Sequence, residues 1–232
     1  GTRPVTGTRP PEGAGRPLPP RQNGPMTLTV GFDLDMTLID SRPGIRATYV
    51  ELSARTGVRI DADLAVSRLG PPLEHELAHW FPEERIADMA AAYREIYPTH
   101  AIHPSPALPG AEDAIQAVRA TGGRSMVVTA KNAPHATLHL THVGLKPDTV
   151  VGSLWAEAKA EALRAQGARV YVGDHLGDIR GARAAGALAV SVATGPYGED
   201  DLRAAGADVV LPDLTAFPAW WAAYAEGADA LA

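Results

Sequence analysis

Short apolar runs alternate with amphipathic stretches along most of the chain. The runs have the length of strands that are buried on both faces, and the amphipathic stretches repeat with helical spacing and often end at a glycine. Strands are predicted at 28–32, 124–129, 148–151, 169–173, 188–192 and 208–211, and the helices between them at 111–121, 134–143, 156–166 and 179–185. This alternation predicts parallel β-α-β units, so the expected fold class is α/β with a doubly wound parallel sheet.

One long region interrupts the alternation. After an expected break at Ser41-Arg42-Pro43-Gly44, the pattern is helical only, with helices predicted at 45–56, 63–67, 73–80 and 83–97. A crossover connection does not need so many helical residues. Residues 42–106 are therefore predicted to form an inserted helical subdomain, while 26–41 and 107–232 form the α/β core. Residues 1–25 are rich in Pro, Gly and Arg, which predicts a disordered tail.

Composition narrows the class of protein. With 232 residues and 45% hydrophobic content, the chain can bury a full α/β core. The absence of cysteine excludes disulfides and thiolate sites, and a net charge of −6 without a cluster of Lys and Arg argues against nucleic-acid binding. No apolar stretch approaches the roughly 18 residues that span a bilayer. We expect a cytoplasmic monomer or homodimer with no membrane partner.

Residues that can carry chemistry follow the predicted strands. Since the carboxyl ends of parallel strands share one edge of a sheet, these residues are expected to meet there. Together they offer a carboxylate nucleophile, a second carboxylate for proton transfer, a hydroxyl, a cation and two further acids for a hard metal ion. Aspartate is also common where strands give way to turns, so spacing alone does not decide the matter. The residues are Asp33, Asp35, Thr129, Lys159, Asp174 and Asp178.

In these residues the chain resembles the haloacid dehalogenase superfamily. Asp33-Leu34-Asp35-Met36-Thr37 resembles its first motif, Thr129 its second, Lys159 its third and residues 173–178 its fourth. The helical insert, with Leu69-Gly70-Pro71-Pro72-Leu73 inside it, resembles the phosphoglycolate phosphatase-like branch. The resemblance covers residues 26 to about 219. It implies a Rossmann-like core of this superfamily's type and a helical cap.

The resemblance also implies a reaction, the hydrolysis of a phosphomonoester. Asp33 would attack phosphorus to give an aspartyl-phosphate, and Asp35 would protonate the leaving oxygen and then activate water. An acid at position 35 separates phosphatases from the dehalogenases of the superfamily. Mg²⁺ is the implied cofactor, held by Asp33, the backbone carbonyl of Asp35 and Asp174, with Asp178 in support.

Thr129 and a lysine are implied to bind the phosphoryl oxygens. Lys159 is preferred because it follows the predicted strand at 148–151, although the expected proline is replaced by Ala160. Lys146, which does precede a proline, comes before that strand. Lys131 is a third candidate, two residues past Thr129.

A cap that closes over the site favours a small phosphorylated metabolite. Arg42, Arg46 and Arg68 are candidates for meeting a second anionic group, such as the carboxylate of phosphoglycolate, or are solvated surface arginines. Two other functions stay open: a phosphomutase like β-phosphoglucomutase, and a binding module of this fold without catalysis.

Overall fold

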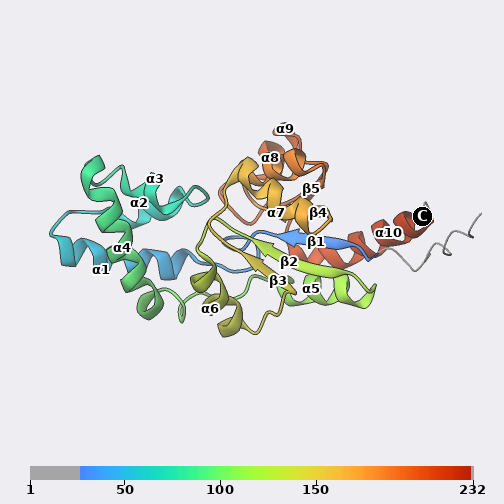
Figure 1. Cartoon of the computed structure of the whole chain (residues 1–232), viewed down its shortest axis with the longest axis horizontal. Coiled ribbons are helices and arrows are strands. Elements are labelled where there is room, and N and C mark those ends of the chain that lie inside the picture. Colours follow the sequence, from blue (N-terminus) through green and yellow to red (C-terminus); the bar gives the residue numbers. More distant parts are fainter. Residues whose placement is uncertain (1–26, 231–232) are drawn as a thin grey trace, which may run out of the picture.

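The computed structural model describes residues 27–230, and the tail predicted for 1–25 lies outside these residues. The core is a six-stranded sheet with the order β3-β2-β1-β4-β5-β6, in which every neighbouring pair is parallel (Figure 1). The strands are β1 (Thr29–Phe32), β2 (Arg124–Val128), β3 (Thr149–Val151), β4 (Ala168–Gly173), β5 (Leu188–Val192) and β6 (Val209–Leu211). The chain therefore folds as the predicted α/β protein with a parallel sheet.

Helices cover both faces of the sheet. One face packs against α5 (Ala111–Ala120), α6 (Ala133–Val143) and α10 (Phe217–Asp229), and the other against α7 (Lys159–Ala165), α8 (Leu176–Ala185) and α9 (Glu199–Ala204). Two short 3-10 turns, η1 (Ala156–Ala158) and η2 (Leu214–Ala216), precede α7 and α10. Side chains of β4 alternate between the layers, since Val170 and Val172 join the first apolar cluster and Tyr171 the second. The doubly wound arrangement is confirmed.

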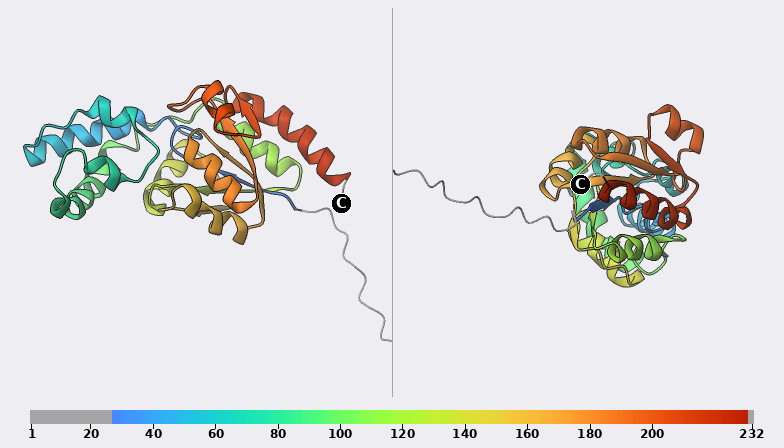
Figure 2. Two further views of the ribbon diagram at one scale, coloured as in Figure 1. Left: turned by 90° about the horizontal axis from the view of Figure 1, so that it is seen from above. Right: turned by 90° about the vertical axis from the view of Figure 1, so that its right-hand side faces the viewer.

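The inserted region forms a helical lobe beside the carboxyl edge of the sheet (Figures 1 and 2). Its helices are α1 (Arg42–Thr56), α2 (Ala62–Ser67), α3 (Leu73–Leu77) and α4 (Glu83–His100). They share an apolar cluster of their own, with Leu52, Leu77 and Ile96 at its centre. Within residues 27–230, no helix is both long and apolar enough to cross a membrane.

The chain enters and leaves this lobe through two segments that lie side by side. Ile39 bridges Ala107 in antiparallel fashion, and the amide of Asp40 donates to the carbonyl of Pro106 at 2.9 Å. The break predicted after Ser41 is wrong, because α1 already begins at Arg42. Proline is tolerated in a first helical turn, where its missing N–H would have no helical partner.

The loop between α2 and α3 reaches back to the core. Gly70 adopts a φ of +140°, and a methyl group there would overlap the imidazole of His175 at the start of α8. Glycine is needed at this position for both reasons. The lobe thus contacts the core directly beside the carboxyl ends of the strands.

Candidate active site

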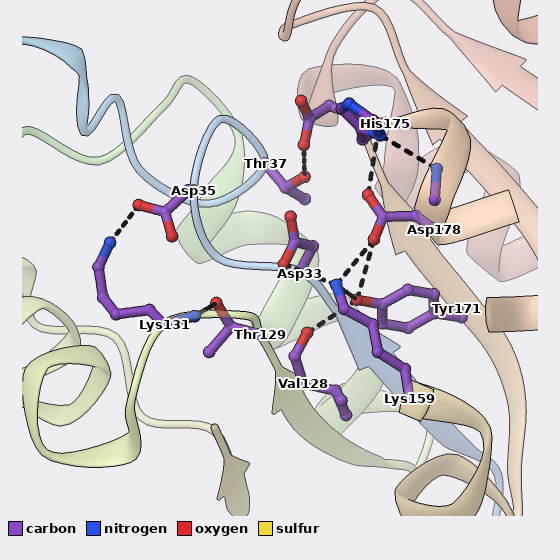
Figure 3. A network of polar contacts seen from close by, with 12 residues as sticks. Asp33, Asp35, Thr37, Val128, Thr129, Lys131, Lys159, Tyr171, His175 and Asp178 are labelled. Carbon is purple, nitrogen blue, oxygen red and sulfur yellow. Dashed lines mark hydrogen bonds and ion pairs between the residues drawn. The ribbon is translucent and has the colours of Figure 1, made fainter. Parts of the chain in front are cut away.

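The candidate residues come from five places along the chain and meet at one edge of the sheet (Figure 3). Asp33 and Asp35 follow β1, Thr129 follows β2, Lys159 begins α7, Asp174 follows β4, and Asp178 lies in the first turn of α8. Just past Asp35 the backbone turns sharply at Met36, which has a φ of +62°. A positive φ is costly for a non-glycine residue and often occurs at functional sites.

Lys159 lies at the centre of the polar network. Its ammonium donates to Asp33 at 3.1 Å, to Asp178 at 2.8 Å and to the hydroxyl of Tyr171 at 2.7 Å. The side chain is only 1% exposed. Burial alone would lower the pKa of Lys159, but the charges of Asp178 and Asp33 raise it above its usual value. Lys159 is therefore a buried cation with two anionic partners.

Three carboxylates gather around this lysine. Asp33, Asp174 and Asp178 each offer an oxygen within 4.8 Å of the others. Burial, together with the charges of Asp178 and Asp35, raises the pKa of Asp33 to about 7 against the pull of Lys159, and burial and Asp33 raise that of Asp174 well above its usual value. The cluster thus has more negative charge than its lysine balances. Buried carboxylate oxygens in this arrangement fit a hard divalent cation such as Mg²⁺.

Asp35 has a different environment. Its carboxylate accepts a hydrogen bond from the ammonium of Lys131 at 2.5 Å. Burial alone would raise the pKa of Asp35, but the nearby charge and hydrogen bond of Lys131 hold it below its usual value. Lys131 also lies 5.0 Å from the ring centroid of Tyr97, and that ring stacks on His135 at 4.7 Å. Lys131 is therefore the partner of Asp35 in this structure.

These contacts separate the three lysines that the sequence left open. Lys159 contacts Asp33, Lys131 contacts Asp35, and Lys146 is exposed, away from both aspartates. Thr129 is 1% exposed, and its hydroxyl accepts a hydrogen bond from the amide of Lys131 at 3.2 Å. The geometry favours Lys159 as the lysine beside Asp33, and its role in binding phosphate stays a prediction.

A loop after β5 supports the acids from the side. A methyl group at Gly195 would overlap the carboxylate of Asp174, so only glycine lets this loop approach so closely. The neighbouring Thr194 hydroxyl donates to the carbonyl of Met36 at 2.7 Å. Thr37 completes the arrangement with a 2.9 Å hydrogen bond to Asp174. The loop therefore holds both the turn after β1 and one of the acids.

The site opens into a cavity of about 300 Å³ between the core and the helical lobe. The core contributes the two aspartates after β1, together with Thr129, Lys131 and Asp174. The lobe contributes aromatic, charged and loop residues. They include Tyr49, Arg68, Gly70, Glu76, Tyr93 and Arg94.

The arginines predicted to meet a second anion are all paired with acids. The guanidinium of Arg68 donates to both carboxylate oxygens of Glu76, at 2.9 and 2.5 Å, and the Trp80 indole donates to the same carboxylate at 2.8 Å. Arg42 and Arg46 each pair with an aspartate and lie outside the cavity lining. Of the three, Arg68 alone lines the cavity.

Sequence reasoning missed Tyr171 and the pairing of Lys131 with Asp35. Tyr171 donates to the backbone carbonyl of Val128 at 2.8 Å while it accepts from Lys159, so it ties the lysine to β2. A tyrosine between two valines of a buried strand was a usable signal, because its hydroxyl must find a partner in the interior. The other pairing joins residues 96 positions apart and leaves no local pattern.

Fold and site together define a phosphatase-like α/β hydrolase with a helical insert. A family model described as haloacid dehalogenase-like hydrolase matches residues 30–192, which is more than half of the chain. The protein therefore belongs to the haloacid dehalogenase-like hydrolase family.

Individual relatives agree with this family. The chain is 26% identical over 219 residues to a phosphoglycolate phosphatase of Caulobacter vibrioides, covering 82% of this chain and 89% of that protein. It is 30% identical over 205 residues to the pyrophosphatase PpaX of Halalkalibacterium halodurans, covering 80% and 94%. A predicted phosphatase from Clostridium acetobutylicum shares the fold with a TM-score of 0.73 at 22% identity, covering 83% and 97%.

Proposed function

We propose that this hydrolase cleaves phosphomonoesters of small metabolites through an aspartyl-phosphate, with Mg²⁺ as its cofactor. The observation that carries the proposal is the position of Asp33. Its carboxylate lies at the end of β1, lines the cavity, and contacts both the buried Lys159 and the cluster of acids. A nucleophile needs access to substrate and a neighbouring cation to offset the charge of the incoming phosphoryl group.

The proposed reaction has two steps. In the first, a carboxylate oxygen of Asp33 bonds to phosphorus, the bond from phosphorus to the leaving oxygen breaks, and Asp35 gives that oxygen a proton. In the second, Asp35 takes a proton from water, the water oxygen bonds to phosphorus, and the bond to Asp33 breaks to release phosphate. Lys131 favours the ionised Asp35 that the second step requires. Protonation of Asp35 before the first step requires this contact to loosen.

The remaining residues of the site position the phosphoryl group. Mg²⁺, when bound, neutralises charge on that group during transfer. Asp33, Asp174 and Asp178 would hold the ion, with the backbone carbonyl of Asp35 as a further ligand. Thr129 and Lys159 would bind phosphoryl oxygens, since both lie at the same edge of the sheet.

The helical lobe, residues 42–106, would act as a mobile cap that excludes water from the site. A cavity of about 300 Å³ under this lobe favours a small substrate. The relatives at 26% and 30% identity are named for two different substrates, phosphoglycolate and pyrophosphate. A phosphoglycolate-like substrate was expected from the cap arginines, but its carboxylate would have to compete with Glu76 for Arg68.

Replacement of the nucleophile tests the proposed function. Asp33→Asn should abolish phosphate release from p-nitrophenyl phosphate with Mg²⁺, while circular dichroism and the melting temperature show an intact fold. Asp200→Asn, a change at an exposed carboxylate of α9, is the control and should keep wild-type turnover. Undiminished turnover by the Asp33 variant would remove this residue from the role of nucleophile.

A further inference from the structure

Among the described residues that line the cavity, no lysine or arginine lacks an acidic partner. Each lysine or arginine that lines the cavity already contacts an acid: Lys131 contacts Asp35, Arg68 contacts Glu76, and Arg94 contacts Glu74 at 2.6 Å. The pair of Arg68 and Glu76 is the most restrained, since both guanidinium contacts and the Trp80 indole converge on the Glu76 carboxylate.

A second anionic group on the substrate would bind weakly beside the pair of Arg68 and Glu76. To reach Arg68, a carboxylate would have to approach the oxygens of Glu76, which are already in contact with that guanidinium. The side chains of this pair are only 32% and 13% exposed, so solvent screens the repulsion less than at an open surface. Like charges at such a site lower affinity and select against anionic ligands.

Two neutral hydroxyl groups are available in the same region. Tyr49 and Tyr93 both line the cavity, are 3% and 6% exposed, and have ring centroids 4.9 Å apart. In the described part of the chain, neither hydroxyl makes a hydrogen bond. By contrast, the hydroxyl of Tyr97, whose ring packs against Tyr93, pairs with Nε2 of His139 at 2.8 Å. Buried polar groups normally have partners, and a cavity-lining hydroxyl without one can take its partner from a ligand.

We infer that the leaving group of the substrate is an uncharged, polyhydroxylated alcohol, of the sugar or polyol class, whose hydroxyls bond to Tyr49 and Tyr93. The inference rests on the proposed phosphomonoester hydrolysis and adds the chemistry of the leaving group. Tyrosine hydroxyls both donate and accept, which suits the hydroxyls of a polyol. A site built to bond hydroxyls discriminates strongly against analogues without them, because its own polar groups then stay unpaired.

A substrate panel tests the inference. Values of kcat/KM are measured for a hexose 6-phosphate, glycerol 3-phosphate, phosphoglycolate, a nucleoside monophosphate and p-nitrophenyl phosphate with Mg²⁺. The hexose or glycerol phosphate should exceed phosphoglycolate at least tenfold. A lead for phosphoglycolate or the nucleotide would overturn the inference, while absence of phosphate release from every substrate would instead overturn the proposed function.

Single-oxygen deletions test the two tyrosines. Tyr49→Phe and Tyr93→Phe should each lower the ratio of kcat/KM for the sugar phosphate to that for p-nitrophenyl phosphate about tenfold. Tyr224→Phe, in α10 and outside the cavity lining, should keep the wild-type ratio. An unchanged ratio in both cavity variants would contradict the assignment.

Removing the acidic partner of Arg68 should have the opposite effect and favour an anionic substrate. Glu76→Gln removes the competing negative charge, so kcat/KM for phosphoglycolate relative to the sugar phosphate should rise at least fivefold. The double variant Glu76→Gln with Arg68→Met should lose this gain, because the freed guanidinium is absent. A ratio that does not respond to Glu76→Gln would show that this ion pair does not exclude anions.

Discussion

Asp33 and Asp35 are two residues apart, and their pKa values shift in opposite directions. Burial and the neighbouring carboxylates raise the pKa of Asp33 to about 7, whereas Lys131 overcomes burial and lowers that of Asp35. Two carboxyl groups with distinct environments can take distinct roles in one reaction. The lowered pKa of Asp35 suits the base of the second step. A raised pKa by itself does not favour a nucleophile, so the proposed role of Asp33 rests on its position beside Lys159 and the acid cluster.

The side chain of Lys159 should be required for both stability and activity. Lys159→Met leaves Asp33 and Asp178 without their cation, and removal of one partner from a buried ion pair typically costs about 3–5 kcal/mol. We expect the free energy of unfolding in urea to fall by a similar amount and phosphate release to be lost. Lys146→Met, at an exposed lysine, is the matched control. Wild-type activity in the Lys159 variant would contradict its role in binding the phosphoryl group and would leave Lys131 as the candidate for that role.

His139 should make stability depend on pH. Its ring is buried, Nε2 pairs with the Tyr97 hydroxyl, and Nδ1 has no partner in the described residues. Burial, then Lys131, lowers the pKa of His139 to about 3. The unfolded chain, with an ordinary pKa near 6.5, takes up the proton first, so this residue's contribution to stability is complete above that value and is lost as pH falls.

Urea titrations at pH 7.5 and 5.5 measure this effect. Between these values His139 should account for about 1.4 kcal/mol of lost stability, and His139→Gln should reduce the wild-type loss by roughly that amount. His103→Gln, at an exposed imidazole, serves as the control. Equal pH dependence in wild type and the His139 variant would disprove the prediction.

At the scale of elements, the apolar pattern predicted all six strands of the sheet to within one residue at either end. The helix α9 was not predicted, because Leu202 is its one buried residue and no apolar periodicity can arise from it. Its first turn contains three acids, which stabilise the positive end of a helix dipole. This start signal is weaker than a periodic apolar face.

The candidate acids could be predicted because parallel strands bring their carboxyl ends to one edge. The partners of those acids could not. Lys131 meets Asp35, and Tyr171 meets Lys159, only after the sheet order and the side-chain conformations are set. Arg68 and Glu76 are only eight residues apart, but the loop between α2 and α3 decides whether they meet. The sequence therefore suggested an available arginine where the structure has a closed ion pair.

The loop after β5 provides a prediction for an element. Gly195→Ala places a methyl group against the Asp174 carboxylate and should lower kcat/KM about 100-fold, or about 2.7 kcal/mol. Gly198→Ala, three residues further on, is a matched control, because its methyl group would meet nothing closer than Asp201 at 3.8 Å. Similar activity in both variants would mean that Asp174 tolerates displacement.

At the scale of the whole molecule, the cavity lies between two separately packed parts. The core has an apolar cluster on each face of its sheet, the helical lobe has a cluster of its own, and the paired segments around Ile39 and Ala107 connect the two parts. The residues proposed to carry the chemistry come from the core, while the lobe supplies most of the remaining cavity wall. Substitutions in the lobe can therefore change the substrate preference without disturbing the acids at the strand ends.

Binding of Mg²⁺ should stabilise the whole fold, because the acid cluster exists only in the folded chain. At a free Mg²⁺ concentration 100 times Kd, the gain in unfolding free energy should be about 2.7 kcal/mol. Asp174→Asn should lose most of this gain in urea titrations with and without Mg²⁺. Equal stabilisation of the wild type and this variant would place the ion elsewhere.

The most direct test of the account is to identify the residue that carries the phosphoryl group. The enzyme is mixed with p-nitrophenyl phosphate and Mg²⁺, quenched in acid within its first turnovers, digested, and analysed by mass spectrometry. We predict one added phosphoryl group on the peptide that contains Asp33, localised to that residue and absent from Asp33→Asn. A phosphoryl group on any other residue, or rapid turnover by the wild type without any phosphorylated peptide, would contradict it.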